Sequence, residues 1–228
     1  MSNDFKRIPY GISSFKQVRE EGLYLVDKSM FFEQLELAGN FFYIVRPRRF
    51  GKSLFLNMLE AYYDINEKDN FDKLFAGLYV ADHPTGNRNK YLVIHLDFSQ
   101  IQGDVDLIAE NLNIYLTNQC NLFALKYKQF YPAELTQLLQ QATTGSSKLN
   151  LIGNLSRQLG IRLYLIVDEY DNFTNDVLNT KGQQAYHELT HGTGIYRELF
   201  KKFKPVFDRI IMLGVSPITL DDLTSGYN

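Results

Sequence analysis

The sequence predicts an α/β fold, in which a mainly parallel sheet is flanked by helices to give three layers. Four short apolar segments, separated by segments of helical periodicity, lead to this prediction. The apolar segments are FFYIV (41–45), YLVIHLDF (91–98), LYLIVDE (163–169) and RIIMLGVS (209–216). They are rich in β-branched and aromatic residues and show little polar alternation, which is typical of strands buried on both faces of a parallel sheet.

The segments between these strands have the spacing of amphipathic helices. The predicted helices cover residues 53–63, 104–119, 132–142, 149–160, 183–190 and 195–204. We expect residues 66–90 to form a polar surface excursion, because turn residues gather near the end of this segment. The alternation of strands and helices predicts a doubly wound arrangement.

The composition is that of an ordinary globular chain and excludes several classes of protein. Of the 228 residues, 45% are hydrophobic, and the net charge of −2 gives no overall attraction to nucleic acid or membranes. A single cysteine, Cys120, excludes an internal disulfide and a multi-thiolate metal site. No apolar stretch has the length of a membrane span, and the N-terminus lacks a signal peptide, so we expect a cytoplasmic protein.

One short stretch, VRPRRFGKSLF (45–55), ends like a phosphate-binding loop. Gly51, Lys52 and Ser53 lead from a predicted strand into a predicted helix, where backbone amides and the positive helix end face bound phosphate. In this arrangement Lys52 reaches the outer phosphates and the Ser53 hydroxyl holds Mg²⁺.

The entrance to this loop departs from the usual pattern. Arg46 stands where a glycine normally permits a tight turn, and Pro47 removes one backbone donor. Arg48 and Arg49 are expected to offset that loss by direct charge contact with phosphate. The alternative is a basic, solvated turn. The candidate nucleotide-binding residues of the loop are Arg46, Pro47, Arg48, Arg49, Phe50, Gly51, Lys52, Ser53 and Leu54.

Adjacent carboxylates, Asp168 and Glu169, end the third predicted strand. Acids at the end of a buried strand are costly unless they bind a cation or other donors, so Asp168 is expected to complete a Mg²⁺ shell and Glu169 to polarise the attacking water. The alternative is an acidic strand end that caps a helix. Asp171 is a weaker third acid, expected in a turn or a helix cap. Ser216 and Thr219 follow the fourth strand, where either hydroxyl is placed to contact the γ-phosphate or to form a local turn.

Several separated motifs together resemble the AAA-ATPase-like family of bacteria. They are RPRRFGKS (46–53), IVDEYDN (166–172), LGVSPITLDDLTSGYN (213–228) and the N-terminal IPYGISSFKQVREEGLYLVDKS (8–29). The resemblance implies a P-loop NTPase of the additional-strand type that uses ATP and Mg²⁺. It assigns Lys52 and Ser53 to phosphate and metal, and Asp168 and Glu169 to metal binding and water activation.

Members of this family often continue into a PD-(D/E)XK-type nuclease domain. The resemblance therefore implies that this domain works with a C-terminal nuclease domain or with a partner protein. We expect a single domain here, with residues 1–40 as an N-terminal segment and 41–228 as the core. Because the chain stops just past the fourth strand, it is expected to be a fragment without a lid or nuclease domain.

The segment YLVDKS (24–29) precedes the first strand. In related ATPases the matching segment lies near the adenine, which makes Tyr24, Asp27 and Lys28 candidates for base binding. Alternatively, Asp27 or Ser29 caps the helix predicted at MFFEQLELA (30–38).

A competing motif, HELTHGTGIYRE (187–198), has the form of a zinc protease helix with His187 and His191 as ligands and Glu188 as general base. The third ligand position holds Arg197, which cannot bind zinc. The basic and aromatic segment 197–209 suits single-stranded nucleic acid, although an amphipathic helix with a solvated basic face is the commoner explanation.

The leading hypothesis is therefore a Mg²⁺-dependent ATPase or nucleotide switch. The alternative is a nucleotide-binding or vestigial scaffold that positions a nuclease or another partner without hydrolysis. Zinc proteolysis is the remote third.

Overall fold

The computed structural model describes residues 5–101, 105–191 and 194–216. By its internal contacts the chain forms two compact units. The loop unit consists of Met1–Asn40 and Pro47–Val93, and the sheet unit consists of Phe41–Arg46 and Ile94–Asn228. The phosphate-loop motif therefore begins in the sheet unit and continues in the loop unit.

Within the described residues, the sheet has four strands in the order β1-β4-β3-β2. Their bounds are β1 Phe41–Val45, β2 Leu92–Asp97, β3 Leu163–Asp168 and β4 Arg209–Gly214. β4 lies between β1 and β3 and runs parallel to both, and every residue of β3 and β4 is buried. This burial explains the mainly apolar composition of the two central strands.

The strand register brings three strand ends to one edge of the sheet. Val45 pairs with Gly214, and Asp168 pairs with Leu213. The backbone N–H of Arg46 extends this ladder by donating to the carbonyl oxygen of Gly214 at 3.1 Å. The chain therefore leaves β1 toward the loop, and leaves β3 at the acidic pair, along the same edge.

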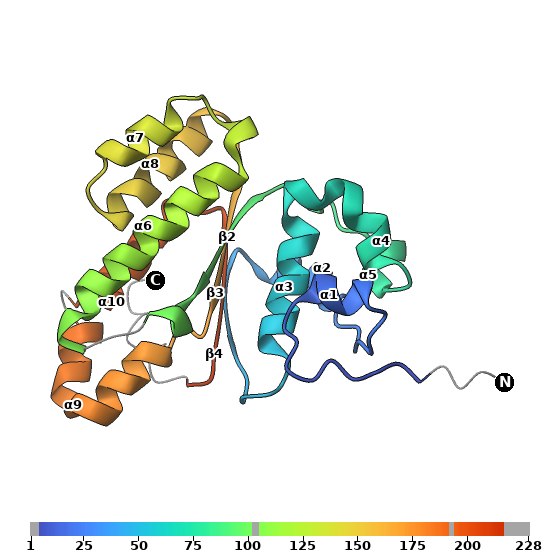
Figure 1. The fold of residues 1–228 in the computed structure, drawn as a ribbon, viewed down its shortest axis with the longest axis horizontal. Helices are drawn as coiled ribbons and strands as arrows, with labels where there is room; N and C mark the ends of the chain where they lie inside the picture. Colours follow the sequence, from blue (N-terminus) through green and yellow to red (C-terminus); the bar gives the residue numbers. More distant parts are fainter. Residues whose placement is uncertain (1–4, 102–104, 192–193, 217–228) are drawn as a thin grey trace. The chain divides into compact units, whose positions relative to one another are not determined.

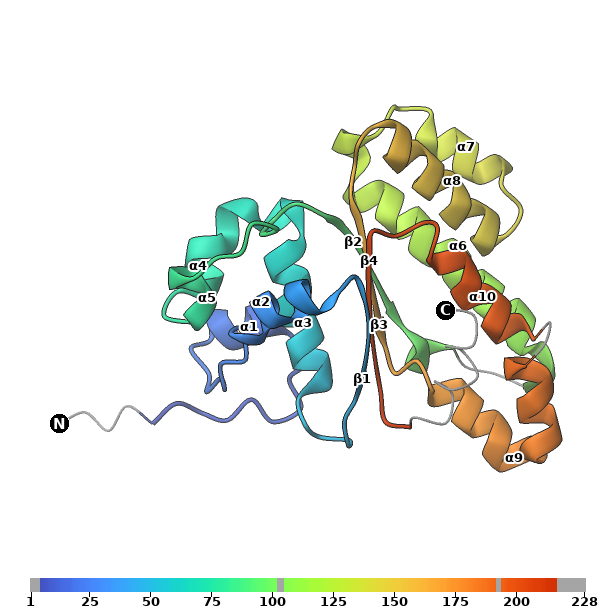
Figure 2. The same ribbon diagram turned by 180° about the vertical axis from the view of Figure 1, so that it is seen from behind.

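Five helices of the sheet unit lie together on one side of the sheet (Figures 1 and 2). They are α6 Ile108–Lys126, α7 Leu135–Gln141, α8 Gly145–Gln158, α9 Asn172–Thr190 and α10 Ile195–Phe203. α6 packs against α7 and α8, and α10 packs against α8 and α9. Phe98, Phe173, Tyr196 and Phe200 form an aromatic cluster in this layer, with neighbouring ring centroids 4.6–6.2 Å apart. Short 3₁₀ turns at Phe98–Gln100, Val105–Leu107 and Lys128–Phe130 complete the unit.

The loop unit is helical and has its own aromatic core. Its elements are α1 Phe15–Glu20, α2 Phe31–Ala38, α3 Lys52–Tyr63, a 3₁₀ turn Ile65–Asn70, α4 Phe71–Phe75 and α5 Tyr79–Asp82. Phe32 packs on Tyr62 with ring centroids 4.8 Å apart, and Phe75 contacts both Phe15 and Tyr62. α3 packs against α1, so the helix that follows the loop is buried on one side by the N-terminal segment.

The structure confirms the predicted α/β class and the parallel pairing of the sheet. It also corrects the expected surface excursion at residues 66–90, because Phe71, Leu74 and Phe75 are buried core residues there. The helices α4 and α5 in this segment are only five and four residues long, which is too short for a helical periodicity to be recognised in the sequence. Among the described residues, no helix has the length and apolar character needed to cross a membrane.

Candidate functional site

Two left-handed residues shape the loop before α3. Arg49 has a φ of 68° and Gly51 a φ of 71°. Gly51 is the N-cap residue of α3 and adopts this conformation without steric cost. Arg49 is a non-glycine residue in the same region, which costs about 1–2 kcal/mol. In the usual pattern a glycine at position 46 would adopt the left-handed conformation. Here that conformation is found at Arg49 and Gly51 instead.

The N-terminus of α3 is open. No side chain caps it, and its first turn contains no acid. The backbone N–H of Phe55 makes the first intrahelical bond, to the carbonyl oxygen of Gly51 at 3.0 Å. The amides of Lys52, Ser53 and Leu54 precede that bond and point out of the helix end, where they suit an anion.

The side chain of Lys52 folds back over the loop. It is only 8% exposed, and its Nζ donates to the carbonyl oxygen of Pro47 at 3.4 Å. Within the described residues this long hydrogen bond is its only polar contact, although an ammonium group has three donors. Ser53, half-buried beside it, has no hydrogen-bond partner for its hydroxyl among the same residues. Both side chains therefore retain capacity for a ligand.

Positive charge gathers around this open helix end. The loop unit places Lys28, Arg48, Arg49 and Lys52 at or beside the loop, and within the described parts of the chain none of them is ion-paired. Like charges held close together without carboxylate partners favour an anionic ligand.

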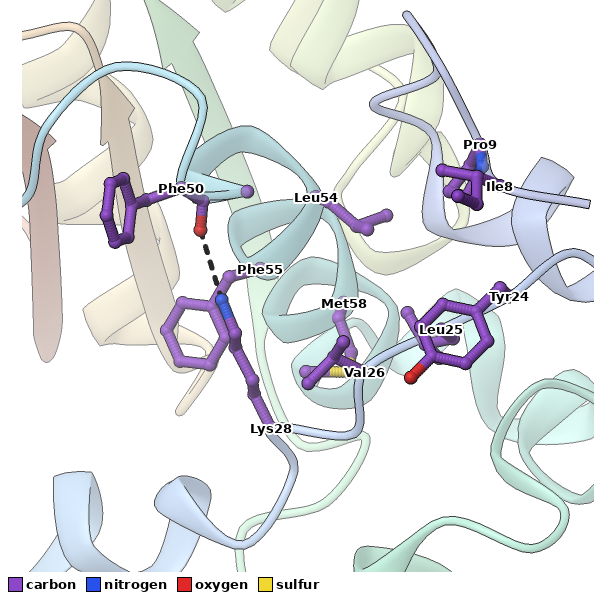
Figure 3. Close-up of a pocket in the computed structure, with 11 residues that line it drawn as sticks. Ile8, Pro9, Tyr24, Leu25, Val26, Lys28, Phe50, Leu54, Phe55 and Met58 are labelled. Carbon is purple, nitrogen blue, oxygen red and sulfur yellow. Dashed lines mark hydrogen bonds between the residues drawn. The ribbon is translucent and has the colours of Figure 1, made fainter.

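A cavity of about 480 Å³ adjoins the loop (Figure 3). Its lining residues are Ile8, Pro9, Tyr24, Leu25, Val26, Lys28, Phe50, Gly51, Leu54, Phe55 and Met58. Lys28 is the only charged residue in this set. α3 contributes Leu54, Phe55 and Met58, so the helix that presents its amides to the loop also forms a wall of the cavity. A cavity with mainly apolar walls and a cationic end suits a ring joined to an anionic group.

Asp27 is held by backbone amides. Its Oδ1 accepts from Ser29 N–H at 2.8 Å and its Oδ2 from Tyr79 N–H at 2.7 Å. Burial alone raises the pKa of Asp27, but these amides, the Ser29 hydroxyl and the charge of Arg19 outweigh it, so the pKa lies below its ordinary value. The Ser29 hydroxyl accepts from Val80 N–H at 3.1 Å. Asp27 and Ser29 thus cap α5, whereas α2, the helix the sequence suggested, has no side-chain cap.

The acidic pair lies at the edge of the sheet where β3 ends. Asp168 is 4% exposed, and its Oδ1 accepts from the backbone N–H of Glu169 at 2.9 Å. In the described chain Asp168 has no cationic partner, which leaves a buried carboxylate suited to a cation. Glu169 is half-buried and has a left-handed φ of 52°, so the chain turns sharply here.

Asp171 has a larger structural role than the sequence indicated. Its Oδ2 accepts from Val215 N–H at 3.1 Å and from Ser216 N–H at 2.5 Å. Although Asp171 occupies the N-cap position of α9, its side chain makes no capping bond there. Tyr170 adds a second link by donating its hydroxyl to the carbonyl oxygen of Ser216 at 2.8 Å. The backbone of Ser216 is therefore fixed to the acidic segment; Thr219 lies outside the described residues.

The zinc motif does not form one helix. α9 ends at Thr190, and α10 begins at Ile195 with Gly194 as its N-cap residue. The rings of His187 and His191 are 4.0 Å apart, but no group of three or more His, Cys, Asp or Glu suited to a metal occurs among the described residues.

The basic segment 197–209 begins within an amphipathic helix. Tyr196, Phe200 and Phe203 are buried, so their rings do not offer a stacking surface to a nucleic acid base. Lys201 and Lys202 are exposed, and Lys201 pairs with Glu198 at 2.9 Å.

The chain belongs to the AAA-ATPase-like family, whose model, described as predicted AAA-ATPase, matches residues 9–224. A curated relative, titled "Uncharacterized protein in vnfD 5′region", from Azotobacter chroococcum mcd 1, is 31% identical over 229 residues. This match covers 98% of the present chain and 40% of the relative, so the chain spans well under half the length of that protein. No solved structure matches the chain.

Proposed function

We propose that this chain is an ATP-binding P-loop domain that hydrolyses ATP in the presence of Mg²⁺. The observation that carries the proposal is the buried amine of Lys52, which has only the Pro47 carbonyl as its partner among the described residues, at the uncapped start of α3. Family membership supports nucleotide binding in general.

The phosphates are proposed to lie on the first-turn amides of α3. Lys52 neutralises their charge, and Arg48 and Arg49 add positive field at the mouth of the loop. The adjoining cavity is proposed to hold the base, because its walls are mainly apolar and it reaches the loop at Gly51. Asp27 supports this site by fixing the backbone beside Lys28.

Mg²⁺ is proposed to be held by the Ser53 hydroxyl and the Asp168 carboxylate. Two observations agree with this assignment: the described residues provide no partner for the Ser53 hydroxyl and no cation for the buried Asp168. When bound, Mg²⁺ supplies charge neutralisation to the β- and γ-phosphates. Glu169 is proposed to orient and deprotonate the attacking water. Ser216, whose backbone N–H is bound by Asp171, is proposed to contact the γ-phosphate.

The strand order supports the additional-strand class of P-loop domain. β4 separates β1, which leads into the loop, from β3, which carries the acids. The aligned ends of β1 and β3 favour a shared role for the loop and the acids. A nuclease module or other protein partner is proposed from the family resemblance.

Measuring ATP binding and phosphate release for two variants tests the proposal. Lys52→Ala is expected to abolish ATP binding, whereas Glu169→Gln is expected to keep binding and lose turnover. Lys68→Ala, which removes an exposed lysine outside the cavity lining, is the matched control. Unchanged ATP affinity in Lys52→Ala contradicts the proposal. Tight binding by the wild type without phosphate release, with and without DNA, favours the non-hydrolysing scaffold.

A further inference from the structure

Lys28 lies where the apolar cavity meets the loop. Its Nζ donates to the carbonyl oxygen of Phe50 at 3.1 Å, and its side chain also lines the cavity. A Cβ atom built on Gly51 stands 3.7 Å from the same Nζ. Figure 3 shows Lys28 and Phe50 on one side of the view, Ile8 and Pro9 on the other, and Leu54 between.

The backbone beside Lys28 is held in place. Asp27 binds the N–H of Tyr79 and of Ser29, so the residues on both sides of Lys28 are fixed. Ser29 is buried and accepts from Val80 N–H. Both oxygens of Asp27 accept from backbone amides, and in the described structure Asp27 forms no ion pair with Lys28. Lys28 is thus a positioned cation whose one polar contact in the described structure is a backbone carbonyl.

We infer that Lys28 is a second phosphate-binding lysine, which contacts the phosphate nearest the sugar, while Lys52 serves the outer phosphates. This inference rests on the proposed function. A ligand with its ring in the cavity and its phosphates at the start of α3 passes Gly51 and Lys28 on the way. Lys52 is one residue further along, donates to Pro47 and is not among the residues that line the cavity.

The two lysines predict different patterns of nucleotide affinity. Lys28→Met keeps the length of the side chain and removes its charge, so it is expected to weaken AMP, ADP and ATP alike by about tenfold and to leave adenosine unchanged. Lys52→Ala is expected to abolish ATP binding, to weaken ADP binding and to leave AMP binding nearly unchanged. Lys28→Arg is expected to restore most of the affinity for AMP.

Calorimetric titration of the purified chain with adenosine, AMP, ADP and ATP, with Mg²⁺ present, measures these patterns. Lys68→Met is the matched control, since Lys68 is exposed and does not line the cavity. Thermal unfolding of each ligand-free variant checks the fold, and Lys28→Gln replaces Lys28→Met if the latter is unfolded.

The outcomes separate this inference from the proposed function. Unchanged AMP and ATP affinity in Lys28→Met, with ATP binding lost in Lys52→Ala, overturns the inference alone. Equal losses for adenosine and ATP also overturn it, because Lys28 then serves only to hold the loop. Failure of the wild type to bind any nucleotide overturns both.

Discussion

Asp171 and Ser216 are joined by a short hydrogen bond, in which Asp171 Oδ2 accepts the backbone N–H of Ser216 at 2.5 Å. The same oxygen accepts from Val215 N–H at 3.1 Å. This carboxylate, three residues after the end of β3, therefore fixes the segment that follows β4. Hydrogen bonds therefore join the segment that follows Asp168 and Glu169 to the segment that follows β4.

Asp171→Asn is expected to destabilise the protein. The amide replaces a charged acceptor and can turn an N–H group toward two backbone donors, which costs about 1–3 kcal/mol in the free energy of unfolding. Urea denaturation measures the change, with the exposed Asp176→Asn on α9 as control. Equal midpoints for the two variants contradict this role of Asp171.

Gly214→Ala is expected to disturb the same junction by steric overlap. A Cβ atom at Gly214 would stand 2.5 Å from Tyr170 Cε1 and 2.6 Å from Asp171 Oδ1. Relieving such contacts in a buried strand costs about 1–3 kcal/mol. Gly86→Ala, where a Cβ meets nothing within 4 Å, is the matched control for urea denaturation. A variant at position 214 as stable as this control shows that the junction has room to adjust.

Arg49→Gly is expected to separate stability from function. Glycine relieves the left-handed strain at φ 68°, but it also has a larger conformational entropy in the unfolded state, which offsets part of this gain. The free energy of unfolding is therefore expected to rise by about 0.5 kcal/mol. ATP affinity is expected to fall, because a charge that we propose to contact phosphate is lost. Arg48 lies outside the left-handed region, so Arg48→Gly is expected to lower both the free energy of unfolding and the ATP affinity. Urea denaturation and ATP titration give the two values; a less stable Arg49→Gly contradicts the strain argument.

Stability near acid pH is expected to depend on Asp27. Its pKa lies below the ordinary value of 3.8, so the folded state favours the carboxylate. Such a group contributes its full stability above the unfolded-state pKa and loses it as the pH falls through the lower folded-state pKa. The difference in unfolding free energy between wild type and Asp27→Asn should be constant above about pH 5 and shrink below about pH 4. Urea midpoints from pH 3 to pH 7 test this, and a difference that does not vary with pH argues against it.

The strands were predicted well because apolar composition determines them directly. β1 has the bounds expected from FFYIV, and β3 ends within one residue of the prediction. α9 begins at Asn172, well before the predicted residue 183. The early part of this helix buries only Phe173, Thr174 and Val177, and Gly182 interrupts it with a φ of 83°, so its periodicity is faint.

The loop was predictable because its signal is local. Gly51, Lys52 and Ser53 are consecutive, and the residues around them show where a strand ends and a helix begins. The cavity was not predictable in detail, since it forms where Ile8 and Tyr24 meet residues of α3 that lie far away in sequence. Two hydrogen bonds likewise depend on tertiary packing: the bond from Lys28 to the Phe50 carbonyl and the bond from Ser216 N–H to Asp171.

In the described structure the two loop-facing ammonium groups are both occupied by the loop's own backbone. Lys52 rests on the carbonyl of Pro47 and Lys28 on that of Phe50. Under the proposed function, these carbonyls occupy the ammonium groups in the absence of phosphate. In the proposed function, phosphate binding exchanges neutral acceptors for charged ones in a loop that is already folded, so we expect little chain ordering to accompany it.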